Sequence, residues 1–217
     1  IITSGTSNHA IYGSLGAICG AQGRFDEAVN LLDQALELSP NYPEAYESLG
    51  NVHKARGNLE AAVAFYSTAL KLRPGFPEVH NNLGNVLKAQ GNLDTAIASY
   101  KKAIELKANF PEAHNNLGAA LHGCGDLSAA ISSYNKAIEL NPAYQKAHSN
   151  LSIALQEHGD LDAAIFSCKK LLELNASDPE THNRLGLALQ AKGDLDAAIA
   201  SYEKAIELKA NFPEAHN

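Results

Sequence analysis

Five histidines are the residues of this sequence whose type and spacing could support metal or acid–base chemistry. They recur every 34 residues, at His80, His114, His148, His182 and His216. An imidazole can bind a metal ion or exchange a proton near neutral pH. A constant 34-residue step, however, places each histidine in a different copy of a repeat, and copies separated by a helix pair are too far apart to share one ion. We therefore expect packing histidines rather than metal ligands.

The rest of the chain contains no pattern that is typical of an enzyme site. Cys19, Cys124 and Cys168 show neither a CxxC pair nor a metal-binding spacing, so neither a disulfide framework nor a zinc site is predicted. We find no nucleophile paired with a base and no glycine-rich phosphate loop. The sequence therefore predicts no catalytic residues, no metal and no cofactor.

Charge and hydropathy exclude two classes of partner. The formal net charge of the 217-residue chain is −7, whereas a nucleic-acid partner requires a basic face. No apolar run approaches the roughly 18 residues of a membrane span. The first residues carry no basic region of a signal peptide, and three unpaired cysteines suit a reducing compartment, so we expect a cytoplasmic location. A chain that starts without Met is interpreted as a piece of a longer protein.

Glycine, alanine and leucine share the period of the histidines. Glycine recurs at Gly23, Gly57, Gly91, Gly125, Gly159 and Gly193; alanine keeps the same step from Ala28, and leucine from Leu15. A stack of identical two-helix units produces such a pattern, because each unit meets the same neighbours in the same geometry.

One unit, beginning at Pro77, predicts a helix, a tight turn and a second helix. Proline suits the first position of a helix, and the apolar spacing of Leu83 and Leu87 indicates one buried face, which His80 and Gly84 would share. Gly91 supplies a left-handed residue that ends the helix, and Asn92 or Asp94 could cap the next one. The predicted helices are 9–21, 25–38, 43–56, 59–72, 77–90, 93–106, 111–124, 127–140, 145–158, 161–174, 179–192 and 195–208.

The domain organisation follows from this period. Residues 1–8 form an N-terminal extension, and residues 9–212 hold six units that start near residues 9, 43, 77, 111, 145 and 179. Residues 213–217 would open a truncated seventh unit. Positions within a unit are counted from these starts, so that Pro77 is position 1 of the third unit.

The pattern resembles the tetratricopeptide repeat (TPR) family over almost the whole chain. In the second unit its characteristic residues are Tyr46, Leu49, Gly50, His53, Ala62, Tyr66, Ala69 and Pro74. The resemblance implies an all-α, right-handed α-solenoid of six tandem 34-residue helix-turn-helix units. The fifth unit departs most, with Ser152 for glycine, Cys168 for tyrosine and Leu171 for alanine, so we expect altered packing there.

Asparagines form the most informative stripe of the first helices. If positions 4, 7, 8 and 11 pack, positions 2, 5, 6, 9, 12 and 13 face away and line a concave wall. The stripe comprises Asn51, Asn81, Asn82, Asn85, Asn115, Asn116, Asn150 and Asn183. Primary amides can pair with both the C=O and the N–H groups of an extended peptide. The alternative is a solvated face that was duplicated from one Asn-rich ancestral unit.

Two groups of TPR proteins offer precedents for this wall. The series Asn82, Asn116, Asn150 resembles the asparagine ladder inside the superhelix of O-GlcNAc transferases. The clamp that grips a C-terminal carboxylate in cochaperones corresponds here to Asn81, Asn85, Asn116, Lys146 and Asn150. Two of its three cationic positions are neutral in this chain, so a carboxylate would meet one cation instead of three.

Three functional hypotheses remain open at this stage. The first is a non-catalytic scaffold that binds an extended segment of a partner protein along the groove. The second is the substrate-recruiting arm of a larger enzyme, for instance a glycosyltransferase. The third is a structural module that self-associates end to end. An apolar strip on the last helix would allow the third, with a complementary surface around Ile11 and Ile18; the strip comprises Ile199, Tyr202, Ile206 and Leu208.

Overall fold

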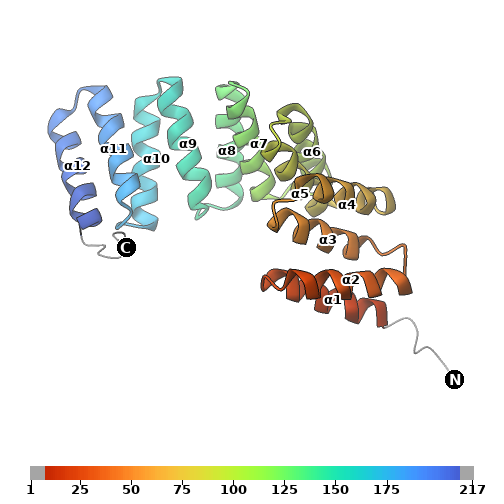
Figure 1. Cartoon of the computed structure of the whole chain (residues 1–217). Coiled ribbons are helices and arrows are strands. Elements are labelled where there is room, and N and C mark those ends of the chain that lie inside the picture. The colour runs from red at the N-terminus through yellow and green to blue at the C-terminus, as the bar shows by residue number, and fades with distance from the viewer. Residues whose placement is uncertain (1–7, 211–217) are drawn as a thin grey trace. The chain divides into compact units, whose positions relative to one another are not determined.

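The computed structural model describes residues 8–210, and this part of the chain contains twelve α-helices and no β-strand. Figure 1 shows the helices in chain order. They are α1 (Asn8–Ala21), α2 (Phe25–Leu38), α3 (Pro43–Ala55), α4 (Leu59–Leu72), α5 (Pro77–Ala89), α6 (Leu93–Leu106), α7 (Pro111–Gly123), α8 (Leu127–Leu140), α9 (Gln145–His158), α10 (Leu161–Leu174), α11 (Pro179–Lys192) and α12 (Leu195–Ala210). Each boundary lies within about two residues of its prediction, the usual scatter at helix ends.

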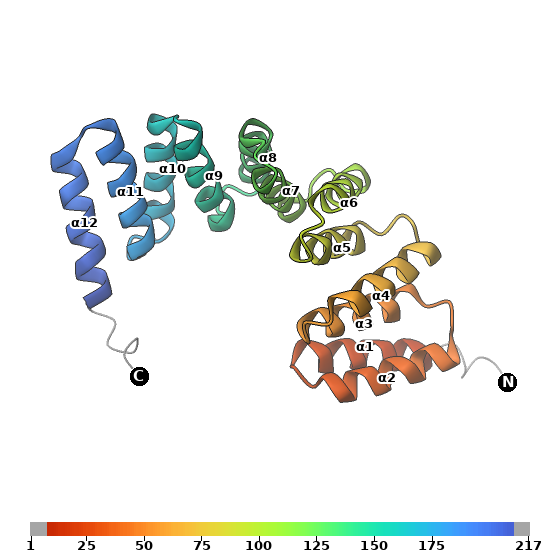
Figure 2. The same cartoon turned by 45° about the horizontal axis from the view of Figure 1, so that its top comes forward.

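The helices form six helix-turn-helix units, which confirms the predicted all-α solenoid class. The chain divides into an N-terminal part, residues 1–108, and a C-terminal part, residues 109–217. In each part three antiparallel helix pairs follow one another, and both views show the two helices of a pair side by side (Figures 1 and 2). The first helices of successive units also contact each other within a part, as α3 does with α1 and α5, and α9 with α7 and α11. Residues 1–7 of the expected N-terminal extension, the truncated seventh unit and His216 lie outside the described residues; Asn8, which we assigned to the extension, is the first residue of α1.

The turn inside every unit is built on a left-handed glycine, as predicted. The φ angles run from 75° at Gly57 to 90° at Gly193, and Gly91 has a φ of 80°. A Cβ at Gly91 would meet nothing within 4 Å. Glycine is therefore required there by backbone conformation and not by crowding.

Of the two residues that we predicted could cap α6, Asn92 and Asp94, Asn92 does not cap it. Asn92 is the N-cap residue of α6, yet its side chain makes no capping hydrogen bond. Where aspartate occupies the same position, the side chain does cap: Asp126 accepts from the Ala129 N–H at 3.1 Å, and Asp160 from the Ala163 N–H at 3.2 Å. The charged carboxylate is also the better partner for the positive end of a helix.

The first helices bury a second face that the sequence pattern did not indicate. Val79 and Val86, at positions 3 and 10 of α5, are almost wholly buried and cluster with Ala62, Tyr66 and Ala69 of α4. Within each part, a first helix thus packs on its own partner helix and, where a unit of the same part precedes it, also on the second helix of that unit, as α3, α5, α9 and α11 do. The prediction that positions 4, 7, 8 and 11 form the buried face covers only the first of these contacts.

Candidate functional site

In the N-terminal part, two asparagines of the predicted stripe are held by buried tyrosines. The Oη of Tyr66 donates to Oδ1 of Asn51 at 2.7 Å, and the Oη of Tyr100 donates to Oδ1 of Asn85 at 2.8 Å. Both tyrosines are fully buried, and burial raises the pKa of each phenol well above its usual value. The phenols therefore stay protonated donors at neutral pH, and they fix the orientation of both amides.

A third amide joins the same network from the neighbouring helix. Nδ2 of Asn82 on α5 donates to Oδ1 of Asn51 on α3 at 3.4 Å. Asn81, next to Asn82, is only 8% exposed. The expectation that position 5 faces away from the packed core is therefore wrong for Asn81.

The C-terminal part repeats this arrangement with different positions. Asn115 on α7 is fully buried, which also contradicts the expectation for position 5. Its Oδ1 accepts from Nδ2 of Asn150 on α9 at 2.9 Å, and its own Nδ2 donates to Oδ1 of Asn116 at 3.4 Å. These side chains bond to one another, so part of the asparagine stripe stabilises the stacking of first helices.

Arg184 takes the place of the asparagine in the sixth unit and reaches back in the same way. Its Nη1 donates to Oγ of Ser149 at 2.6 Å and to Oγ of Ser152 at 3.4 Å. The Arg184 side chain is 13% exposed, and its Nε is buried without a partner. Sequence analysis did not select Arg184. The sequence nevertheless shows arginine at position 6 of the sixth unit, where the third, fourth and fifth units have asparagine.

Two predicted site residues on α9 and α11 remain exposed. Neither Lys146 nor Asn183 makes a side-chain hydrogen bond or an ion pair with another described residue. Lys146 lines a small hollow of about 190 Å³ together with Arg184 and Thr181. The stripe therefore contains amides engaged in packing, whereas Asn183 of the stripe, and also Lys146, remain available to a partner.

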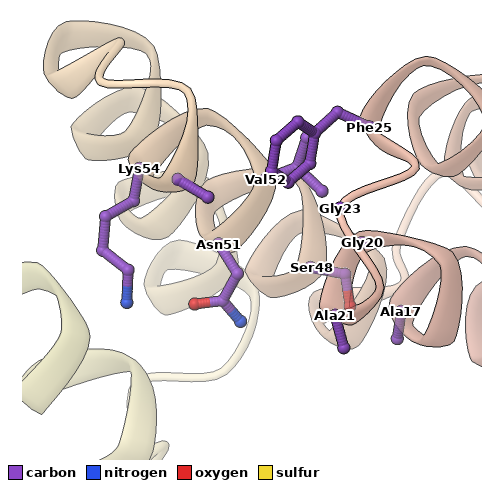
Figure 3. A pocket seen from close by; sticks show the side chains of 10 residues that line it. Ala17, Gly20, Ala21, Gly23, Phe25, Ser48, Asn51, Val52 and Lys54 are labelled. Atoms are coloured by element: carbon purple, nitrogen blue, oxygen red, sulfur yellow. The ribbon is translucent and has the colours of Figure 1, made fainter. Parts of the chain in front are cut away.

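A larger hollow of about 470 Å³ lies between α1 and α3 in the N-terminal part. Small residues form its α1 side, and Ser48, Asn51 and Lys54 project from α3. Figure 3 shows the Asn51 amide and the Lys54 ammonium on the same side of α3. Of these residues, sequence analysis selected only Asn51. The signal that it missed is that positions 9, 12 and 13 of the first unit are all small residues, namely Ala17, Gly20 and Ala21.

The charges near this hollow are only partly compensated. Burial lowers the pKa of the Lys54 ammonium, against the influence of the Glu47 carboxylate. Burial and the nearby Glu78 carboxylate raise the pKa of Glu47. Among the described residues, no carboxylate oxygen lies within ion-pairing distance of the Lys54 Nζ. Lys54 is thus a half-buried cation without a direct counter-ion.

The periodic histidines contribute to packing. The ring Nε2 of His80 donates to the carbonyl oxygen of Pro74 at 2.9 Å, and that of His148 to the carbonyl oxygen of Pro142 at 3.0 Å. Each bond ties a first helix to the linker before it. Within residues 8–210 no group of three His, Cys, Asp or Glu side chains could hold a metal ion, and no helix is long and apolar enough to cross a membrane.

Comparison with known proteins gives a consistent family match along the chain. A family model described as TPR repeat matches residues 16–56, 50–91 and 84–125. Models described as tetratricopeptide repeat match residues 111–144, 133–166 and 179–212. No curated protein matches the sequence.

Solved structures show the same fold. The crystal structure of MamA protein is 29% identical, with a TM-score of 0.74, and the alignment covers 81% of this chain and 97% of that chain. PilF from Pseudomonas aeruginosa is 20% identical, with a TM-score of 0.83 and coverage of 98% and 96%. YrrB, described as a TPR protein with an unusual peptide-binding site, is 22% identical, with a TM-score of 0.72 and coverage of 83% and 93%.

Proposed function

This chain belongs to the tetratricopeptide repeat family, and we propose that it acts as a non-catalytic scaffold that binds an extended peptide segment of a partner protein. The fold is of the protein-interaction type. The proposed groove is the face of the first helices that carries the asparagine stripe and Lys146. YrrB, a similar fold, is described with a peptide-binding site.

The observation that carries the proposal is the fixed orientation of the amides. Oδ1 of Asn51 accepts two hydrogen bonds, from Tyr66 and from Asn82, which leaves its Nδ2 as a donor. A side chain that is already ordered loses little entropy when it binds a ligand. Amides held in this way suit the carbonyl groups of an extended backbone, whose side chains they need not contact.

The test must separate binding from stability, because several groove amides also stabilise the stack. Removing Asn150, for example, would leave the buried Oδ1 of Asn115 without its donor from α9 and destabilise the fold by about 1–3 kcal/mol. Asn183 is exposed and makes no side-chain hydrogen bond, so it is the cleaner probe. Asn135, an exposed asparagine of α8, provides the matched control on a second helix.

We would select linear peptides from a random phage-displayed library with the whole chain and measure their affinities by isothermal titration calorimetry. The Asn183→Ala and Lys146→Ala variants should bind about threefold to tenfold more weakly, since one hydrogen bond contributes about 1 kcal/mol. Their melting temperatures should stay within about one degree of the wild type. Equal losses in Asn135→Ala, or unchanged affinity in both groove variants, would reject the groove.

The exposed face of α12 favours a second candidate function, end-to-end association of copies. Leu195, Ile199 and Ile206 are 59%, 55% and 68% exposed, whereas Val63, the counterpart of Ile199 in α4, packs in a cluster with residues of α5. Tyr202 and Leu208, which we expected to belong to the exposed strip, are half-buried. Burial of apolar surface against the exposed Ile11 and Ile18 of a second copy would be favourable.

Sedimentation velocity over a range of protein concentrations tests this second candidate. We expect association that Ile199→Glu together with Ile206→Glu abolishes. Phe166→Ser is the control, because Phe166 is also exposed but lies on α10, at a position where the fourth unit carries Ser132. A single monomeric boundary at the highest concentration would exclude end-to-end association of this chain.

A further inference from the structure

In the hollow between α1 and α3, the Asn51 side chain offers a hydrogen-bond donor, because its acceptor oxygen is already engaged. Oδ1 of Asn51 is engaged by two donors, Tyr66 at 2.7 Å and Asn82 at 3.4 Å. Its Nδ2 bonds to no described residue and points into the open space of the hollow (Figure 3). A group that binds beside Asn51 must therefore accept a hydrogen bond.

The second feature of the hollow is its cation. The Nζ of Lys54 lies on the same side of α3 as the Asn51 amide (Figure 3). It lacks an ion-pair partner among the described residues, and the carboxyl of Glu47 acts on it only through longer-range attraction. A partly desolvated ammonium ion gains most from an anionic acceptor, because a charge-assisted hydrogen bond is about twice as strong as a neutral one.

The opposite wall of the hollow is small and apolar. Ala17, Gly20 and Ala21 come from α1, and Phe25 and Val52 close the far end. The corresponding position-9 residues of the fifth and sixth units are Ile153 and Leu187. The space that an aliphatic side chain occupies in those units is thus left open beside Ala17.

We propose that this hollow binds a carboxylate of the partner peptide through Asn51 and Lys54, while an adjacent aliphatic side chain of the same peptide packs on Ala17 and Ala21. The inference rests on the proposed function, because it assigns a specific subsite to the same groove. The carboxylate can come from the end of a chain or from an internal aspartate or glutamate. Ser48, which is half-buried on α3 and lines the same hollow, offers a third donor.

Three synthetic peptides distinguish the two sources of the carboxylate. They are acetyl-Ala-Ala-Leu with a free C-terminal carboxylate, the same peptide as its C-terminal amide, and acetyl-Ala-Glu-Leu-amide. Each is titrated into the uniformly ¹⁵N-labelled whole chain, and backbone and side-chain amide shifts are followed by NMR. We expect shifts at Gly20, Ala21 and the Asn51 side-chain amide, and an affinity for at least one of the two carboxylate peptides about tenfold above that of the neutral amide.

Two variants drawn from the chain's own repeats test the assigned residues. Lys54→Gln introduces the residue found at the same position in the fifth and sixth units, Gln156 and Gln190, and it should reduce the preference for a carboxylate to within about twofold. Ala17→Leu introduces the residue of the sixth unit, Leu187, and should weaken all three peptides at least fivefold by filling the hollow. Lys88→Gln, the same exchange in the third unit, is the control and should leave the affinities unchanged.

The outcomes distinguish a failure of the proposed subsite from a failure of the proposed groove. If neither carboxylate peptide binds more tightly than the neutral amide, or if Lys88→Gln has an equal effect, the subsite is overturned. Peptide shifts confined to other first helices also overturn the subsite but leave the proposed groove intact. If these peptides shift no amide at millimolar concentration and the phage selection yields no binder, both proposals fail. Circular dichroism melts of every variant establish that the fold is retained.

Discussion

In the pair α5/α6 a glycine of the first helix faces a tyrosine of the second, whereas the pair α9/α10 places Ser152 against Cys168. A Cβ added at Gly84 would lie 2.6 Å from Cε1 of Tyr100, far closer than real contacts allow. In the fifth unit the second-helix side chain is smaller, and the first helix carries a hydroxymethyl group instead of hydrogen. Both Ser152 and Cys168 are almost fully buried.

The two pairs differ in hydrogen bonding as well as in volume. The Tyr100 hydroxyl donates a hydrogen bond to Asn85 of the groove face. The shorter Cys168 side chain cannot make this bond, and Ile153, which replaces the asparagine at position 9 of the fifth unit, could not accept it. Instead, the Ser152 hydroxyl donates to the Ser149 carbonyl at 2.8 Å and accepts from Arg184. The comparison teaches that the residues at this contact change as a set, because volume and polar partners must both be matched.

The largest expected effect comes from giving the third unit the second-helix residue of the fifth. Tyr100→Cys removes a fully buried ring and should destabilise the chain by about 3 kcal/mol in urea unfolding. Adding Gly84→Ser to this variant should restore about 1 kcal/mol, because the serine fills part of the vacated volume. If the double variant is less stable than Tyr100→Cys alone, the first-helix residue does not compensate for the change in the second-helix residue.

The reverse exchange in the fifth unit should have an intermediate effect. Cys168→Tyr alone inserts a ring against the Ser152 side chain, and overpacking of this kind destabilises by about 1–3 kcal/mol. Together with Ser152→Gly the same change recreates the pair found in the second, third, fourth and sixth units and should return the stability to within about 1 kcal/mol of the wild type. The four chains form a double-mutant cycle, and additive losses across it would contradict the comparison.

The turn glycines should respond alike in both pairs. Gly91 and Gly159 have φ angles of 80° and 89° and open space around them. Gly91→Val and Gly159→Val should each destabilise by about 1–2 kcal/mol through backbone strain alone. Hydrogen exchange of the flanking helices measures both losses locally; a markedly smaller loss in one unit would show that the two pairs also differ at their turns.

The smallest expected effect is a difference in alkaline stability. Burial raises the pKa of the Cys168 thiol, so the folded chain retains a proton that the unfolded thiol releases near a pH of about 8.5. The stabilisation from this group is complete below that pH and declines as the pH rises towards the pKa of the folded thiol. Urea unfolding at two pH values should show this decline, and Cys168→Ser should remove it; an unchanged decline would place its origin elsewhere.

The sequence was sufficient for the fold because the signals that end and start helices recur. Gly91 and its five counterparts locate the turns, and prolines such as Pro77 locate the first helices. The sequence was less informative about which faces are buried. Val79 and Val86 pack on a neighbouring unit, and a hydrophobic pattern within one helix does not distinguish that contact from contact with its own partner.

The candidate site was predicted only in part, for a related physical reason. An asparagine can either bind a ligand or pair with another amide, and the sequence does not indicate which. Asn115 and Asn150 pair with each other, whereas Asn183 stays exposed. The donor property of Asn51 depends on bonds from Tyr66 and Asn82, which become apparent only when three helices are brought together.

The bonds between successive first helices have a constant direction and step in the C-terminal part, and this bears on how such an array can lengthen. Asn150 donates to Asn115 and Arg184 donates to Ser149, and both partners lie 35 residues upstream. A recombination event that copies one whole 34-residue unit gives the new unit a donor for the unit before it and an acceptor for the unit after it. Residues 96–114 and 198–216 are the same 19-residue string apart from Lys101 and Glu203. A gene that grows by whole units would carry such a copied string, and every newly formed junction would inherit its polar pairing from the start.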